Sequence, residues 1–194
     1  KYDNELNLIK GKSSFQLGKY DQAYKYFSKC DLANLKPSDE ERYEIGYTCY
    51  SQKKYEEANV QFIKLSILDS PLGQISNFYL GQSFFKLNKK QNAYNAFAEA
   101  KRQSHNLEIK ESAHFNYAKL AVELGYSSVA LKTLQDFITE FPESQNNDDA
   151  KGLLAELFLQ TKNYRQACEI LSNLKSYNNQ TKMAYQAVHF HRAE

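Results

Sequence analysis

The sequence predicts an all-α fold built from repeated helical hairpins, and three observations support this prediction. The 194 residues include only three prolines and seven glycines but 15 tyrosines and 12 phenylalanines, so few residues interrupt helices and much apolar bulk needs burial. Apolar residues recur three and four positions apart, as at Ile45 and Cys49. The string GKYDQAYKYF at 18–27 is echoed 35 positions later by KKYEEANVQF at 53–62. Helices packed on helices, in a repeated unit, are therefore expected.

Three columns of residues define the repeat. An alanine recurs every 35 to 37 positions, with a small residue twelve positions before it and a bulky residue four positions after it. Two antiparallel helices joined by a tight turn approach closely only where the crossing side chains are small, and a large neighbour then fills the adjoining space. The alanines are Ala23, Ala58, Ala93, Ala130 and Ala167; the small residues are Gly11, Gly46, Gly81, Ala118 and Ala155; the bulky residues are Phe27, Phe62, Phe97, Leu134 and Leu171.

Turn and capping signals fall where this scheme requires them. A turn is expected between the small residue and the alanine of every unit, at 17–19, 52–54, 87–89, 124–126 and 161–163. Helix starts are predicted from a capping box at Ser38 and Glu41, an N-cap at Ser70 before a proline, and a third cap at Asn147 or Asp148. Each predicted unit thus has its own start and turn.

These columns and their spacing resemble the tetratricopeptide repeat, a helix-turn-helix unit of about 34 residues that stacks into a right-handed solenoid. The resemblance implies a right-handed α-solenoid of five units plus a trailing helix, forming a single array over residues 1–194. The units are expected at about 4–37, 39–72, 74–107, 111–144 and 148–179, and the trailing helix at about 181–193.

The trailing helix is expected to pack its Met183, Ala187 and Phe190 side on the fifth unit. The rest of its circumference still carries apolar residues such as Val188, whereas a terminal helix should be polar on its outer face. Because Lys1 is also not an initiator methionine, we expect the chain to be a fragment of a longer protein.

Composition and charge argue against several classes of function. With 42% hydrophobic residues the chain is expected to fold, and a net charge of +2 lacks the basic surplus typical of proteins that bind nucleic acid or anionic membranes. No apolar run approaches the roughly 18 residues of a membrane span. Cys30, Cys49 and Cys168 form no CxxC pair and are interpreted as small packing residues.

The sequence shows no catalytic, cofactor-binding or metal-binding constellation. GKSSFQLGKY at 11–20 has six residues between its glycines instead of the four of a phosphate-binding loop. His189 and His191 are two positions apart, which places them on different sides of a helix. Paired acids such as Glu56 and Glu57 fall at helix starts, where they complement the helix dipole. We predict a non-catalytic protein with no cofactor and no bound metal.

In known tetratricopeptide proteins, the first helices of the units line a concave ligand surface. Its inward positions lie three residues before, one after and four after the small residue. In the second and third units these positions are mostly aromatic, and tyrosine suits interfaces because it buries a large area and keeps a polar hydroxyl. The predicted groove comprises Tyr43, Tyr47, Tyr50, Phe78, Gln82, Phe85, Phe115 and Lys119.

The predicted groove suits an extended or helical segment of a protein partner. For Phe15, Tyr50 and Phe85, packing against a neighbouring unit is as good an interpretation as binding, and Tyr79 and Glu44 are expected at the edge of the groove. Two other hypotheses stay open. The repeats could be a structural or regulatory arm of a larger protein whose own chain fills the groove, or residues distant in sequence could assemble an active site.

One specialised form of the family binds the C-terminal carboxylate of chaperones through lysine, asparagine and arginine residues. This chain has Leu8, Lys12, Glu44, Ile75 and Tyr79 at the matching positions. Since Glu44 would repel a carboxylate, no chaperone clamp is expected.

A second resemblance concerns one junction between units. The string FITEFPESQNNDDAKGLLAELFL at 137–159 resembles the repeats of bacterial cell-envelope tetratricopeptide proteins, in which a bulky pair, a proline and a serine precede an acidic helix start. It favours a periplasmic or outer-membrane-associated location over the cytoplasm, without insertion of this chain into the membrane.

Overall fold

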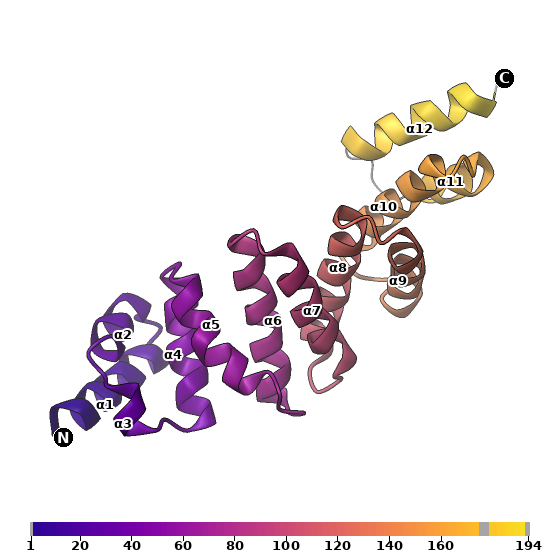
Figure 1. Cartoon of the computed structure of the whole chain (residues 1–194). Helices are drawn as coiled ribbons and strands as arrows, with labels where there is room; N and C mark the ends of the chain where they lie inside the picture. The colour runs from indigo at the N-terminus through magenta and orange to yellow at the C-terminus, as the bar shows by residue number, and fades with distance from the viewer. Residues whose placement is uncertain (1, 175–178, 193–194) are drawn as a thin grey trace. The chain divides into compact units, whose positions relative to one another are not determined.

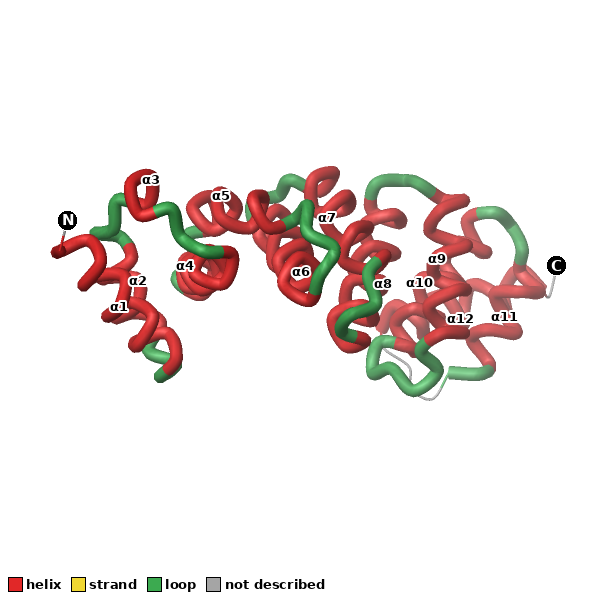
Figure 2. Tube along the Cα trace, turned by 90° about the horizontal axis from the view of Figure 1, so that it is seen from below, coloured by secondary structure: helices red, strands yellow, loops and turns green. Residues whose placement is uncertain are grey.

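The computed structural model describes residues 2–174 and 179–192. These residues form twelve helices joined by loops, with no strand among them (Figures 1 and 2). The helices are α1 (Tyr2–Gln16), α2 (Tyr20–Phe27), α3 (Leu32–Leu35), α4 (Asp39–Ser51), α5 (Tyr55–Leu65), α6 (Pro71–Lys86), α7 (Lys90–Arg102), α8 (Leu107–Glu123), α9 (Ser127–Glu140), α10 (Asn147–Gln160), α11 (Tyr164–Ser172) and α12 (Asn179–Arg192). The all-α prediction is confirmed.

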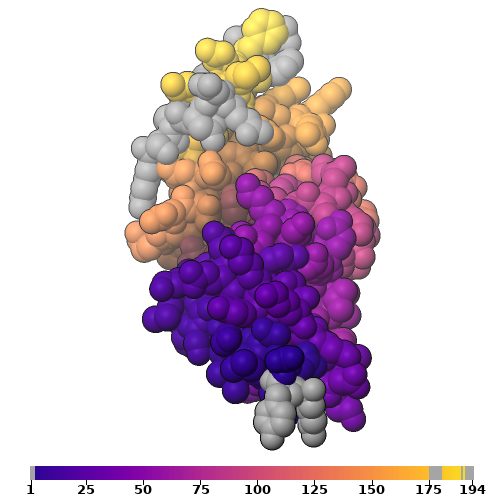
Figure 3. All heavy atoms as spheres, turned by 90° about the vertical axis from the view of Figure 1, so that its left-hand side faces the viewer, coloured from indigo at the N-terminus to yellow at the C-terminus, as the bar shows by residue number. Residues whose placement is uncertain are grey.

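The chain divides into two compact units, Lys1–Lys110 and Glu111–Glu194. In the first unit, α1 packs on α2, α4 on α5 and α6 on α7, while α2 also contacts α4 and α5 contacts α6. Figure 3 faces the N-terminal end of this unit, where α1 and α2 (indigo) form the outer surface. In the second unit, α10 contacts α9, α11 and α12. That the repeats form one continuous array stays a prediction.

The hairpins of the first unit cross where a glycine meets a phenylalanine ring. A Cβ atom added to Gly46 would lie 2.9 Å from Cε1 of Phe62, and one added to Gly81 would lie 2.8 Å from Phe97. Gly11 meets Phe27 in the same way. No side chain fits between such helices without displacing the ring, which is the close approach that the repeat columns predict.

The second unit builds the same crossing from different residues. Its small positions are alanines and its bulky positions are leucines, and all of them are fully buried: Ala118, Ala130, Leu134, Ala155, Ala167 and Leu171. The chain therefore pairs glycine with phenylalanine in three repeats and alanine with leucine in two. Added volume on one helix is matched by reduced volume on the other, as close packing requires.

All five hairpin turns contain one residue in the left-handed conformation, at the centre of the expected triplet. Glycine supplies it twice, with φ of 69° at Gly18 and 75° at Gly125. The other turns use Lys53, Asn88 and Lys162, with φ values of 59°, 57° and 60°. The two lysines occupy a backbone conformation that disfavours side chains with a Cβ atom.

Two of the three predicted caps are confirmed. Ser38 and Glu41 form a capping box at the start of α4, and the Ser70 hydroxyl accepts a hydrogen bond from the backbone N–H of Gly73. The third prediction is wrong, because α10 begins after Asn146, whose side chain makes no cap. The Asn147 side chain turns back instead and donates to the carbonyl of Phe141, 3.1 Å away.

The predicted packing face of the trailing helix is also wrong. In α12, Met183 and Phe190 are 71% and 65% exposed and Ala187 is half-buried, whereas Thr181, Ala184 and Val188 are buried. The physical reason is close approach, since a Cβ atom added to Gly152 of α10 would lie 2.7 Å from Cγ2 of Thr181. Small and β-branched side chains fit that gap, and long ones are left outside.

In several repeats, a polar side chain seven positions before the small residue forms hydrogen bonds with the loop that follows the second helix. Asn4 exchanges two hydrogen bonds with the backbone of Asp31, and Gln74, fully buried, exchanges two with the backbone of Asn106. In the second unit the Ser144 hydroxyl donates to Glu111. The Asp31 side chain also caps the short helix α3, which the sequence did not predict.

Candidate functional site

Seven aromatic rings gather on the first compact unit. We call this group the tyrosine cluster; it comprises Phe15, Tyr20, Tyr43, Tyr47, Tyr50, Tyr55 and Tyr79, all half-buried. Tyr47 lies at its centre, with its ring centroid 5.0 Å from that of Tyr79 and 5.4 Å from that of Tyr20. Most of these pairs meet edge-on or tilted, the arrangements that aromatic rings prefer.

The repeat architecture explains why these rings meet. Tyr43, Tyr47 and Tyr50 lie four and three positions apart, so they share one face of α4. The first helices α1, α4 and α6 are neighbours, which brings Phe15 and Tyr79 to either side of that face. Rings from separate hairpins thus form one surface.

The tyrosine cluster stands on the hydrophobic core. Phe62, fully buried, stacks on Tyr79 with centroids 6.0 Å apart and an interplanar angle of 20°. The ring centroid of Tyr43 lies 6.3 Å from that of Phe62. The inner faces of these tyrosines are therefore held by packing while part of each ring stays open, so a ligand would meet a surface that is already ordered.

Burial favours the neutral form of four tyrosine hydroxyls of the cluster, because it raises their pKa values. Burial, and then the neighbouring tyrosine hydroxyls, raise the pKa of Tyr43 and of Tyr79 well above the ordinary value of 10.0. The pKa of Tyr50 and of Tyr20 is raised for the same first reason, burial. A neutral hydroxyl both donates and accepts hydrogen bonds, which suits the peptide backbone of a ligand.

One carboxylate of the acidic edge beside the cluster is paired with a lysine of the same protein. The Lys12 ammonium lies 2.8 Å from the Glu41 carboxylate, and this hydrogen bond raises the pKa of Lys12 and lowers that of Glu41. Glu44 was expected at the groove edge, but it is only 8% exposed and accepts a hydrogen bond from the Gln16 side chain. Burial raises the pKa of the Glu44 carboxyl group.

The other predicted groove residues of the first unit differ in position. Phe78 is half-buried, with its ring 5.5 Å from Tyr79 and 5.9 Å from Phe97, so it joins the cluster to the core of the third hairpin. Gln82 is half-buried, and Phe85 is 40% exposed. Of the alternatives for Phe85, packing and binding, its exposure favours a role at the surface.

The prediction that Phe115 lines the groove is wrong. Phe115 is only 8% exposed, and its ring lies 5.5 Å from the fully buried Phe137. The ring therefore packs inward on α9 of its own hairpin, in the second compact unit. Lys119 is exposed, with its ammonium 5.9 Å from the centroid of Phe115.

Sequence reasoning missed three members of the cluster. Tyr79 was expected at the groove edge and instead contacts Tyr43, Tyr47 and Tyr50. Tyr20 and Tyr55 open the second helices and were not considered. A signal was present, because both follow directly after a predicted turn and are 35 positions apart.

The described residues offer little for other chemistry. They contain no group of three or more His, Cys, Asp or Glu side chains placed to hold a metal ion. Burial raises the pKa of the Cys49 thiol to about 12 and also raises that of Cys30, so these thiols stay protonated. No described helix has the length and apolar content required to cross a bilayer.

Comparison with known families matches the repeats at the start of the chain. Models of the tetratricopeptide repeat match residues 5–36 and residues 43–63. These segments overlap the first two predicted units. No curated protein sequence matches the chain significantly.

Several solved structures share the fold. MamA matches with a TM-score of 0.66 and 17% identity over 95% of this chain and 97% of that one. YrrB, described as a tetratricopeptide protein with an unusual peptide-binding site, matches with a TM-score of 0.66 and 15% identity over 95% and 89%. Kinesin light chain repeats from Podosopora anserina match with a TM-score of 0.59 and 13% identity over 93% of both chains.

These similarities show a tetratricopeptide-like helical repeat array. Repeats of this kind are typically non-catalytic scaffolds for protein–protein interaction. None of the neighbours is specifically a cell-envelope protein, so the second resemblance in the sequence gains no support and the location stays a prediction.

Proposed function

We propose that the chain is a non-catalytic scaffold that binds an extended segment of a protein partner across the tyrosine cluster. The observation that carries the proposal is the position of Tyr47. Its ring contacts five others, from α1, α2, α4 and α6, on a surface that remains partly open: Phe15, Tyr20, Tyr43, Tyr50 and Tyr79.

The chemistry of the cluster favours a peptide. Tyrosine rings offer apolar faces for side chains and neutral hydroxyls for backbone amide and carbonyl groups. Rings anchored on Phe62 lose little conformational entropy when a ligand binds. The peptide-binding site described for YrrB gives a precedent on the same fold.

The charged edge argues against capture of a terminal carboxylate. Lys12 is the lysine at a clamp position, and its ammonium is engaged by Glu41 at 2.8 Å. The nearby carboxylates of Glu40 and Glu44 add negative charge around it. An internal segment of a partner is therefore favoured over a C-terminal tail.

Selection from a displayed library of random peptides tests this proposal. The parent chain is compared with Tyr47→Ala and Tyr79→Ala, and with Tyr26→Ala as a matched control. Tyr26 is a half-buried tyrosine of α2 outside the cluster, contacted by the Lys10 ammonium. Circular dichroism confirms that each variant is folded.

The parent and Tyr26→Ala should enrich the same peptides, and the two cluster variants should lose them. Peptides that bind all four proteins equally would place recognition elsewhere and contradict the proposal. No enrichment by the folded parent would also contradict it and would favour the alternative, an arm whose groove is filled by its own protein.

A further inference from the structure

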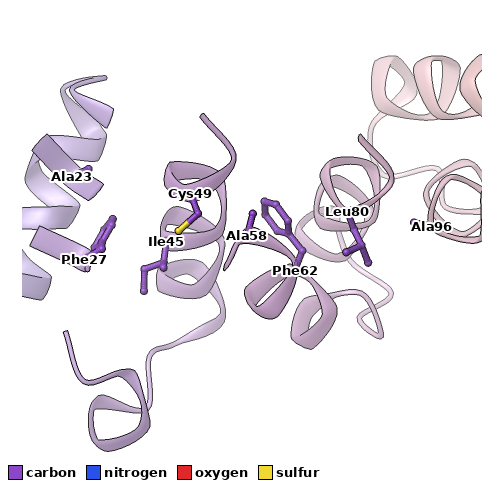
Figure 4. Close-up of a cluster of buried hydrophobic side chains, with 8 residues drawn as sticks. All are labelled: Ala23, Phe27, Ile45, Cys49, Ala58, Phe62, Leu80 and Ala96. Atoms are coloured by element: carbon purple, nitrogen blue, oxygen red, sulfur yellow. The ribbon is translucent and has the colours of Figure 1, made fainter. Parts of the chain in front are cut away.

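A separate pocket of about 240 Å³ lies between the first and second hairpins, among α2, α4 and α5. Its lining is mostly apolar and includes Phe27, Ile45, Cys49 and Val60. Figure 4 shows the side chains of Ile45 and Cys49 extending from α4 toward Phe27. None of the residues that line the pocket belongs to the tyrosine cluster.

One repeat position that lines the pocket carries a small residue. Three positions after the small residue of the first helix, the third and fifth repeats have Phe84 and Phe158, whereas the first, second and fourth have Ser14, Cys49 and Ala121. The corresponding junction in the second compact unit has a pocket of about 450 Å³, whose lining includes Leu154 and not Phe158. In the second repeat, a ring in place of Cys49 would occupy part of the pocket that this side chain lines.

A side chain that lines the pocket carries an unsatisfied hydrogen-bond acceptor. This side chain is Gln61, which is only 5% exposed, and its Oε1 atom has no hydrogen-bond partner. A buried polar atom without a partner carries a desolvation penalty that a bound donor would relieve. At the rim, the Tyr24 hydroxyl already donates to Glu57 at 3.0 Å, so that carboxylate is in part satisfied.

We propose that this pocket binds an aromatic group of two fused rings that carries one N–H or O–H donor, of which indole is the simplest example. The rings would lie against Phe27, Ile45 and Cys49, and the donor would reach Oε1 of Gln61. An apolar cavity of about 150 Å³ accommodates benzene. Pockets for drug-sized ligands begin at about 300 Å³, and a volume of about 240 Å³ lies between these sizes.

The absence of tryptophan from the chain makes the site directly measurable. Indole is titrated with the parent chain, and its fluorescence is excited beyond the tyrosine absorption band. Saturable binding with a blue-shifted emission is expected. Benzothiophene, which has similar rings but no N–H group, is the competitor, and indole should bind roughly threefold to tenfold more tightly because of one hydrogen bond.

Three variants locate the binding. Cys49→Phe reproduces the residue of the third and fifth units and should weaken indole binding at least about tenfold, because the ring occupies the pocket. Cys49→Ala is the matched control that removes the thiol and keeps the space, so it should bind indole like the parent. Gln61→Leu should bind indole and benzothiophene equally, and it tests the hydrogen bond even where Cys49→Phe fails to fold.

Absence of saturable indole binding to the folded parent would overturn the proposal, as would unchanged binding by folded Cys49→Phe or an unchanged preference in Gln61→Leu. N-acetyl-tryptophanamide separates two sources of the ligand. Binding of both probes indicates the tryptophan side chain of a partner, and binding of indole alone indicates a free small molecule.

Discussion

Exchange of the Gly46 and Phe62 pair for the alanine and leucine of the later repeats should show strong coupling between the two positions. In the first compact unit, Gly46 faces the fully buried ring of Phe62. In the second compact unit, Ala155 and Leu171 occupy the equivalent positions, and both are fully buried. Each pair fills one crossing, so a mixed pair is either overfilled or underfilled.

The structure sets the size of each effect. In Gly46→Ala the new Cβ atom would lie 2.9 Å from Cε1 of Phe62 and 3.2 Å from Cβ of Gln61. Such overpacking lowers the free energy of unfolding by about 1 to 3 kcal/mol, and the better helix propensity of alanine raises it by about 1 kcal/mol. Phe62→Leu removes a buried ring and its stacking on Tyr79, and it should cost about 2 kcal/mol.

The double variant should be about 1 to 2 kcal/mol more stable than the sum of the single effects, because the new methyl group occupies part of the volume that the ring vacated. Urea unfolding followed by helical circular dichroism measures the cycle, with the slopes of the transitions compared because repeat arrays can unfold in parts. The converse exchange, Ala155→Gly with Leu171→Phe, is the control. Additivity within about 0.5 kcal/mol would refute this account of the crossing.

Lys53→Gly should raise the stability of the chain by about 0.5 to 1 kcal/mol in thermal unfolding, because glycine adopts the left-handed turn without the penalty that a Cβ atom imposes; a lower melting temperature would count against it. Folding raises the pKa of Tyr43 and of Tyr79 above 10.0. The contribution of these two tyrosines to the free energy of unfolding should therefore be fully present below pH 10.0 and should be lost as the pH rises above it. The slope should reach at most about 1.4 kcal/mol per pH unit for each tyrosine, measured by urea unfolding across alkaline pH, and Tyr43→Phe should reduce it. In α12, Val188→Ala should cost about 1 to 3 kcal/mol, whereas Met183→Ser should change stability by less than about 0.5 kcal/mol. Equal effects of these two substitutions on urea unfolding would contradict the observed face.

The parts of the fold that depend on contacts within one hairpin could be predicted from the sequence. The close approach of the helices at Gly46 and the turn at 52–54 were both predicted from the repeat spacing. Such contacts join residues a fixed distance apart in the chain, so a repeated pattern reveals them.

Contacts between hairpins were harder to predict. The rotation of one repeat on the next decides whether a ring such as Tyr79 contacts the preceding repeat, and this rotation depends on the volumes of both repeats. The packing face of α12 was missed for the same reason, since it is set by the narrow gap beside Gly152 rather than by the bulk of Met183. The pocket beside Cys49 also depends on which neighbouring residues fill or leave space.

Nuclear magnetic resonance of the tyrosine rings measures binding at the tyrosine cluster directly. Isotope-labelled tyrosine is incorporated into the chain, the ring resonances are assigned with single Tyr→Phe variants, and a peptide selected by the parent is titrated. The resonances of Tyr43, Tyr47 and Tyr79 should shift in a saturable manner, while those of Tyr126 and Tyr164, in the second compact unit, stay in place. Saturable shifts confined to Tyr126 and Tyr164 would show that the scaffold binds its partner through another surface.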